Sequence, residues 1–222
     1  MTLRWRLNRD SHWTSAPVDV RPALAVAHSP AADRDPDLVL DQARYVVNHN
    51  DIDPQTQPFM WKGPADLSAR AWVWHEQGKL HLRLDVRDDV HRQKHAASRM
   101  WQGDSIQLGL AVPGQVGYWE LGFAMSNSGK LLTHVWLRPE GTTSTDPRVD
   151  SAVTRIDGDN TRYKIALDLE KLCTKDGSQP DQIAISFAIN DDDSDRREGF
   201  MQLTPGIATQ KSPALFMPIA IE

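Results

Sequence analysis

The chain has 222 residues, of which 40% are hydrophobic and 25% are charged, a composition that supports one folded domain and argues against long disordered stretches. Its formal net charge of −5 gives no electrostatic reason to approach a phosphate backbone or an anionic membrane. Nucleic acid and membranes are therefore not expected as partners.

The first 39 residues differ in composition from the rest of the chain. Proline occurs at positions 17, 22, 30 and 36, and residues 29–37 are polar. We expect peripheral strands at residues 3–7 and 18–26, followed by a loop, within the same domain as residues 40–222. Charged residues near the start, with no run of about 18 apolar residues anywhere, predict neither a signal peptide nor a membrane span in this chain.

Short β-strands dominate the remaining sequence. Residues 79–87 alternate between apolar and polar side chains, the pattern of a half-buried strand. The same period of two predicts strands at 106–112, 119–125, 131–137, 163–169 and 183–189, and weaker patterns indicate 70–75, 201–203 and 215–221. Pro218 predicts that the last of these is an edge strand.

Turn residues show how some of these strands connect. Pro113-Gly114 follows the strand at 106–112, and Asn127-Ser128-Gly129 precedes the strand at 131–137, so these strands are expected to form an antiparallel meander. No long helical period competes with the strand pattern. The sequence therefore predicts an all-β fold, an antiparallel β-sandwich with a jelly-roll-like arrangement.

Three polar segments accompany the strands: residues 61–69 with the strand end at 86–91, residues 100–108, and residues 188–193 with Arg197 and Gly199. In order and spacing, across residues 40–222, they resemble the family 9 carbohydrate-binding modules and related β-sandwich sugar-binding domains. The second segment looks like the family's W-x-x-D-S-x-E pattern, with Gln107 in place of the glutamate. The third is similar to its N-D-x-D strand end followed by R-x-G.

The resemblance implies a carbohydrate ligand. Trp101, expected at the start of a strand after the charged loop 88–99, matches the family's stacking tryptophan, Gln107 its hydroxyl-binding carboxylate, and Asn190 a polar contact. A second stacking tryptophan would follow the asparagine, where this chain has the acidic stretch 191–195, so one-sided stacking or a different ligand is expected. Eight tryptophans, against three tyrosines and five phenylalanines, suit a surface that stacks on sugar rings.

Strand alternation adds further candidates for ligand binding. They lie on polar or mixed strand faces, or at a strand end, and are Arg87, Glu120, Lys130, His134 and Trp136. If neighbouring strands pair in order, one sheet face becomes aromatic and polar and suits a sugar ring. The alternatives are a solvated outer face, and a Trp101 ring that covers the core.

Four carboxylates crowd residues 191–195. The resemblance implies structural calcium, and closely spaced oxygen ligands suit that ion, so Asp191, Asp193 and Asp195 are candidate ligands. An EF-hand is excluded because Arg196 stands where its loop requires glycine. The alternative is an acidic turn offset by neighbouring arginines. A second polar cluster, at residues 88–95, is expected to be structural, with aspartates accepting from turn amides and a histidine packing beneath the loop.

The leading hypothesis is a non-catalytic carbohydrate-binding module appended to a larger secreted or periplasmic polysaccharide-processing protein, with a catalytic domain as neighbour. A second hypothesis is a structural domain that packs on such a catalytic domain through an apolar patch at Trp72, Trp74 or Trp136.

Two further hypotheses involve chemistry. Similar sandwiches hold haem between methionine and lysine, for which Met100, Met125 and Lys211 are available. An enzyme acting on polysaccharide would need a carboxylate pair, such as Glu120 with Asp85 or Asp104. No G-x-S-x-G motif occurs, and the single cysteine, Cys173, excludes an internal disulfide and is read as a buried small residue.

Overall fold

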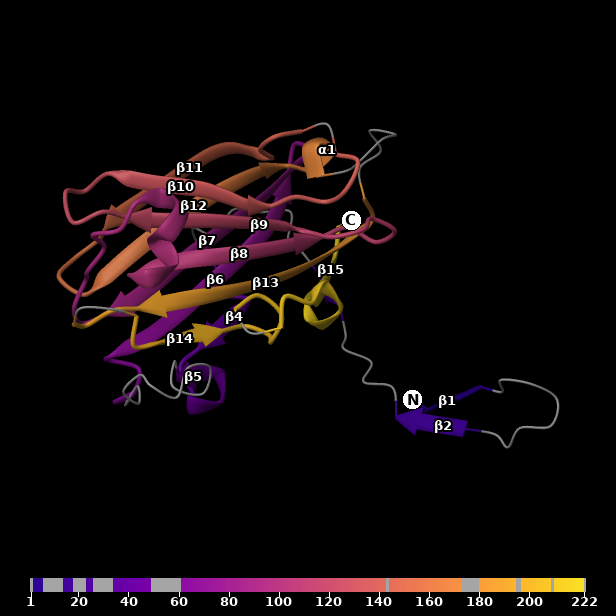
Figure 1. Ribbon diagram of the computed structural model, residues 1–222, viewed down its shortest axis with the longest axis horizontal. Helices are drawn as coiled ribbons and strands as arrows, with labels where there is room; N and C mark the ends of the chain where they lie inside the picture. Colours follow the sequence, from indigo (N-terminus) through magenta and orange to yellow (C-terminus); the bar gives the residue numbers. More distant parts are fainter. Residues whose placement is uncertain are drawn as a thin grey trace.

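The computed structural model describes residues 2–5, 14–17, 23–25, 34–48, 61–142, 144–172, 180–194, 197–208 and 210–221. Two β-sheets pack face to face in this part of the chain (Figure 1). The predicted all-β sandwich is therefore confirmed. Cys173 and Asp195 lie outside the described residues. Within the described chain, no helix has the length and apolar character needed to cross a membrane.

The larger sheet has eight strands, and six of them follow one another from edge to edge. In spatial order these are β10 (Leu131–Leu137), β9 (Trp119–Met125), β8 (Ser105–Ala111), β13 (Gln182–Asp191), β14 (Gly199–Gln202) and β5 (Val46–Asn48). The remaining two, β15 (Met217–Ala220) and β3 (Leu24–Ala25), extend it beside β13. The meander predicted from the turn residues is the β8–β9–β10 part of this sheet.

The smaller sheet has five strands in the order β11 (Arg148–Arg155), β12 (Asn160–Asp168), β7 (Lys79–Asp88), β6 (Leu67–Glu76) and β4 (Leu38–Leu40). Short helical turns connect the strands: η2 (Ala43–Tyr45), η4 (Ala97–Gln102), η5 (Pro213–Leu215) and α1 (Leu169–Leu172). Near the N-terminus, β1 (Thr2–Trp5) pairs with β2 (Thr14–Pro17) in a separate two-stranded sheet.

Two details of the sequence-based prediction were wrong. β15 is not an edge strand, because β13 pairs with one side of it and β3 with the other. Its pairing with β3 begins at Ile219, one residue after Pro218, so the missing proline N–H costs no hydrogen bond on that side. Trp101 lies in η4 rather than at the start of β8. Of the strand predicted at 18–26, residues 24–25 form β3, residue 23 precedes it, and residues 18–22 and 26 lie outside the described residues.

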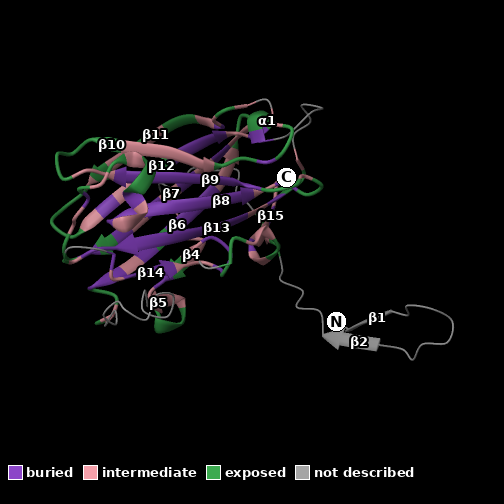
Figure 2. Ribbon diagram, viewed as in Figure 1, coloured by how far each residue is buried: buried purple, intermediate pink, exposed green. Residues whose placement is uncertain are grey.

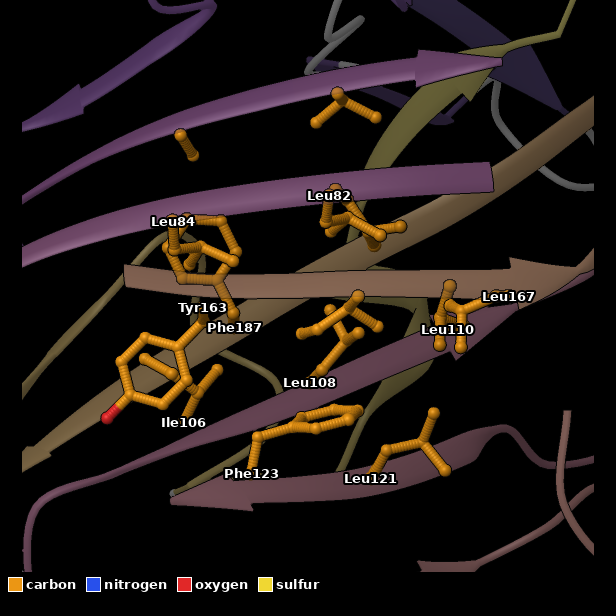
Figure 3. Close-up of a cluster of buried hydrophobic side chains, with 14 of the residues drawn as sticks. Leu82, Leu84, Ile106, Leu108, Leu110, Leu121, Phe123, Tyr163, Leu167 and Phe187 are labelled. Carbon is orange, nitrogen blue, oxygen red and sulfur yellow. The ribbon is translucent and has the colours of Figure 1, made fainter. Parts of the chain in front are cut away.

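The core lies between the two sheets, where the alternating apolar side chains of facing strands meet. Figure 3 shows Leu82 and Leu84 of β7 opposite Ile106, Leu108 and Leu110 of β8, with the side chains of neighbouring strands between them. These four leucines and Ile106 are almost completely buried. Burial of each such side chain contributes about 1.5–3 kcal/mol, so the period-two pattern seen in the sequence is also the main source of stability.

The outer face of the larger sheet is also covered over much of its area. In Figure 2, β8, β9 and β13 are coloured as buried along nearly their whole length, whereas β10 and β11 are largely intermediate or exposed. Since alternate residues of a strand point to opposite faces, burial of consecutive residues means that both faces are covered. The covering segments on the outer face include η4 and η5, and the candidate site lies between such segments.

Candidate functional site

The predicted polar residues Gln107, Glu120 and Asn190 share the outer face of the larger sheet. They belong to three strands, β8, β9 and β13, and each alternates with buried core residues. Strand pairing brings these positions together, because Gln107 lies opposite Ala188 of β13 and Gly122 of β9. Asn190 and Glu120 are each two residues from one of these partners and therefore point to the same face. The sheet therefore gathers side chains that are up to 83 positions apart in the sequence, Asn190 and Gln107, into one hydrogen-bonded group.

A cleft of about 450 Å³ opens over this group. The residues that line it are Trp101, Gln107, Glu120, Trp136, Leu137, Arg197, Ala208 and Lys211. They come from η4, β8, β9 and β10, and from the segments that follow β13 and β14. Four of the residues predicted from the sequence therefore lie in one cleft: Trp101, Gln107, Glu120 and Trp136.

Glu120 is the centre of a hydrogen-bond network at the base of the cleft. Its carboxylate accepts from Gln107 Nε2 at 3.1 Å and from the Tyr118 hydroxyl at 3.1 Å. It also accepts from Lys211 Nζ at 2.6 Å, which makes an ion pair. Burial, and next the Glu120 carboxylate, raise the pKa of Tyr118, so its hydroxyl stays protonated and donates. Both carboxylate oxygens are thus held in place before any ligand enters.

Asn190 lies behind this network rather than in the wall of the cleft. Only 1% of its surface is exposed, and its Nδ2 donates to Ser105 Oγ at 3.0 Å and to Gln107 Oε1 at 3.3 Å. Its Oδ1 is buried without a hydrogen-bond partner. Asn190 therefore orients Gln107, whose amide in turn reaches Glu120.

Two tryptophan rings flank the cleft. Trp101 follows Met100, which is fully buried, whereas Trp101 itself is partly exposed and does not belong to the hydrophobic core of the sandwich. Trp136 donates from Nε1 to the Ser98 carbonyl at 2.9 Å, and its ring lies over Gly122. A Cβ atom at Gly122 would come within 2.4 Å of Trp136 Cη2, so only glycine leaves room for the ring. The family pattern indicated stacking on one ring, that of Trp101. A second ring, that of Trp136 on β10, lines the same cleft, and β10 is not part of the family pattern.

Arg197 forms another wall of the cleft and was not predicted as a ligand-binding residue. It is only 6% exposed, and its guanidinium carbon lies 4.1 Å from the centroid of the Phe200 ring and 5.8 Å from that of Trp101. Its Nε and Nη2 are buried without a hydrogen-bond partner. Burial lowers the pKa of Arg197 to about 9. In the sequence, Arg197 belongs to the R-x-G that follows the acidic stretch. That motif indicated a family resemblance and a positive charge beside the aspartates, but not a ligand-binding role for Arg197.

The other predicted ligand-binding residues lie outside the cleft. Arg87 is on β7 of the smaller sheet, half-exposed, with Asp159 at 3.9 Å. Lys130 is exposed in the turn between β9 and β10. His134 is beside Trp136, with ring centroids 5.4 Å apart at an interplanar angle of 69°, but it does not line the cleft. Lys211, which does line it, was considered only as a haem ligand.

Acidic side chains gather at one end of the sandwich, where strands of both sheets terminate. Ligand atoms of Asp88, Asp191 and Asp193 all lie within 4.8 Å of one another, and so do those of Asp66, Asp89 and Asp193. Asp191 Oδ2 and Asp193 Oδ1 are buried without hydrogen-bond partners. Burial raises the pKa of Asp191 well above its usual value and that of Asp193 to about 6, and neighbouring carboxylates add to both shifts. The sequence indicated two of these five residues.

The second polar cluster makes structural contacts. Asp88 Oδ1 accepts from the Val90 amide at 3.0 Å, and His91 Nε2 lies 2.9 Å from the Met125 carbonyl oxygen. The Asp104 side chain accepts from the backbone amides of Arg92 and Asp192, which ties the loop after β7 to the end of β13. These contacts are of the kind expected from the sequence.

Trp72 and Trp74, the other tryptophans of the second hypothesis, do not form an exposed patch. Trp72 is 7% exposed and donates to the Arg34 carbonyl at 2.9 Å, and Trp74 is partly buried and stacked on His81. Of the haem ligands considered, Met100 is fully buried, Lys211 is paired with Glu120, and Met125 does not line the cleft.

No protein-family model matches the sequence, and a comparison with curated proteins also finds no match. Solved structures do resemble this one. A family 9 carbohydrate-binding module from Caldicellulosiruptor kristjanssonii, in complex with glucose, is 15% identical with a TM-score of 0.56, over 90% of this chain and 96% of that one.

Two further solved structures share this fold. A family 9 module from the same organism, in complex with cellotriose, has a TM-score of 0.55 at 14% identity, over 90% of this chain and 94% of that one. A Bacteroides uniformis protein to which carbohydrate binding has been attributed has a TM-score of 0.54 at 14% identity, over 91% of this chain and all of that one. The chain therefore has the fold of the family 9 carbohydrate-binding modules, as the motifs in its sequence suggested.

Proposed function

We propose that this chain is a carbohydrate-binding module that holds a saccharide in the cleft between Trp101 and Trp136. The observation that carries the proposal is that two tryptophans and a preorganised polar network line one cleft on one sheet face. An indole ring packs against the apolar face of a pyranose, while fixed polar groups recognise its hydroxyls. The solved modules that share this fold are complexes with glucose and with cellotriose, which supports the same ligand class here.

Each polar group of the cleft has a role in this proposal. Glu120 accepts hydrogen bonds from sugar hydroxyls, and Gln107 and Lys211 donate to them through the N–H groups that are not bonded to Glu120. Asn190 acts indirectly by holding Gln107. Arg87 and Lys130 have no part in the site.

The composition of the cleft favours binding over hydrolysis. Glycosidases generally need two carboxylates that flank the scissile bond. Among the described residues that line the cleft, Glu120 is the one carboxylate, and three donors hold it. We therefore propose a non-catalytic binding module. Its place in a larger exported polysaccharide-processing protein, with a catalytic domain as its neighbour, stays a prediction from the sequence.

Titration of the purified chain with oligosaccharides tests this function directly. We expect glucose, cellotriose or related soluble saccharides to bind and to change the tryptophan fluorescence, because both cleft indoles would be in contact with the ligand. Isothermal titration calorimetry should give a matching heat. If a broad panel of plant and bacterial saccharides produces neither a heat nor a fluorescence change at millimolar concentration, the proposal is wrong.

We also propose that the acidic cluster binds calcium. The donor set fits the ion, because Asp66, Asp88, Asp89, Asp191 and Asp193 offer closely spaced oxygens and two of these oxygens are buried without partners. A bound ion would neutralise carboxylates that otherwise repel one another. Because Asp88 ends β7 and Asp191 ends β13, it would also tie the two sheets together.

Calcium should therefore raise the thermal stability of the protein. At a free concentration of about ten times its dissociation constant, the ion should add about 1.4 kcal/mol, or a melting temperature roughly 3–6 °C higher than in EDTA. Differential scanning calorimetry measures the shift, and Asp193→Asn should reduce it. The exposed carboxylate Asp157, outside the cluster, provides the control variant Asp157→Asn, which should keep the shift. An identical melting temperature with calcium and with EDTA would rule the site out.

A further inference from the structure

The least explained residue of the cleft is Arg197, whose buried guanidinium has no acceptor for Nε or Nη2 in the described part of the chain. A buried charge without a partner is costly, and proteins usually avoid it. Other arginines of the same structure do find carboxylates: Arg83 and Arg162 bind Asp85, and Arg148 binds Asp146. Arg197, by contrast, leaves Nε and Nη2 unpartnered, and it lies in the wall of the candidate binding site.

Glu120, the carboxylate that lines the cleft within the described chain, already has other hydrogen-bond partners. It accepts from Gln107, Tyr118 and Lys211, and no ion pair joins it to Arg197. The charged residues that line the cleft within the described chain are Glu120, Lys211 and Arg197. Two cations and one anion leave the cleft with one excess positive charge, which belongs to Arg197.

The contacts of Arg197 hold its guanidinium in place but do not neutralise its positive charge. Its guanidinium lies over the Phe200 ring, and this cation–π contact helps to hold the group in place. The unpartnered atoms, Nε and Nη2, form one edge of the guanidinium. Through the equivalent edge Arg162 binds Asp85, with distances of 2.7 and 2.8 Å to the two carboxylate oxygens. A planar guanidinium edge of this kind matches a carboxylate in charge and in shape.

We propose that the cleft selects a saccharide that carries a carboxylate, a hexuronic acid unit, and that Arg197 binds this carboxylate. The inference rests on the proposed carbohydrate-binding function and names the class of sugar. A neutral sugar offers hydroxyl oxygens to the guanidinium, but it does not balance the charge. A hexuronate keeps the pyranose face for the tryptophans and supplies the missing anion.

Paired ligands that differ at C6, where one carries a carboxylate and the other a neutral group, test this inference. One pair is cellotriose and the trimer of β-1,4-linked glucuronate, and the other is trigalacturonate and its methyl ester. Calorimetric titration of the whole chain should show at least tenfold tighter binding of the acid in one of the pairs. Arg197→Gln should abolish that preference, because it lowers the affinity for the acid far more than the affinity for its neutral partner. Arg70→Gln, which removes an exposed arginine on the smaller sheet, should leave the preference intact.

The outcomes separate the two proposals. If the neutral sugar binds and the acid binds no better, or if the preference survives Arg197→Gln, the uronate inference is overturned and the carbohydrate function stands. Preference for a sulfated trimer over both acids would also overturn it. If no saccharide binds, both proposals fail. The comparison of paired ligands on the unaltered protein decides the matter even if Arg197→Gln does not fold.

Discussion

Replacing Trp101 by alanine should weaken saccharide binding by at least tenfold and leave the fold intact. The ring is partly exposed, lines the cleft and does not belong to the core of the sandwich. Removal of a central aromatic contact from a binding site commonly costs about 2 kcal/mol, which corresponds to roughly 30-fold in affinity. Calorimetric titration with the best saccharide measures the loss, and the thermal transition reports on folding.

A second tryptophan provides the matched control for this variant. Trp74 lies on β6 of the smaller sheet, where it stacks on His81 with ring centroids 4.9 Å apart. Trp74→Ala removes the same ring from a place outside the cleft and should leave the affinity within about twofold of the original. Equal affinity losses in the two variants, or none in Trp101→Ala, would contradict the assignment of Trp101 as a stacking surface.

Replacing Gly122 by alanine should displace the Trp136 ring and so change the wall of the cleft. The Cβ of Gly122→Ala would come within 2.4 Å of Trp136 Cη2 and 2.9 Å of Met100 Sδ. The ring must therefore move out of its present position, and overpacking of this kind costs about 1–3 kcal/mol of stability. We expect a binding loss of about tenfold, because Trp136 then no longer occupies the wall of the cleft. Chemical denaturation and saccharide titration measure the two effects.

Gly158 supplies the corresponding control. It lies outside the cleft, and a Cβ there would meet no atom within 4 Å. Gly158→Ala should keep both the stability and the affinity of the original protein. If Gly122→Ala binds saccharide as tightly as Gly158→Ala does, the position of Trp136 is not important for the site.

The strands were predictable because alternation of apolar and polar residues is a local signal. Residues 79–87, 106–112 and 119–125 became β7, β8 and β9 with shifts of one residue at most. Pairing beyond neighbouring strands was not predictable in this way, because β13 joins β8 from a distant part of the chain. The edge assignment of β15 failed for that reason.

The site was predictable only in part. A period of two shows that Gln107 and Arg87 both point away from the core, but it does not show that they belong to different sheets. Arg197 and Lys211 come from segments after β13 and β14, and only the folded topology brings them beside Trp101. Likewise, Asp66 and Asp88 precede the acidic stretch by more than 100 residues. Composition and spacing carry no information on such long-range contacts.

The central claim is that a saccharide lies between Trp101 and Trp136 on the outer face of the larger sheet. Titration followed by NMR of the indole N–H signals, assigned with single tryptophan variants, tests it most directly. The account predicts large shift changes for Trp101 and Trp136 and none for Trp72 and Trp74. Changes confined to Trp72 and Trp74, with the two cleft signals unmoved, would place the ligand on the other sheet and contradict the account.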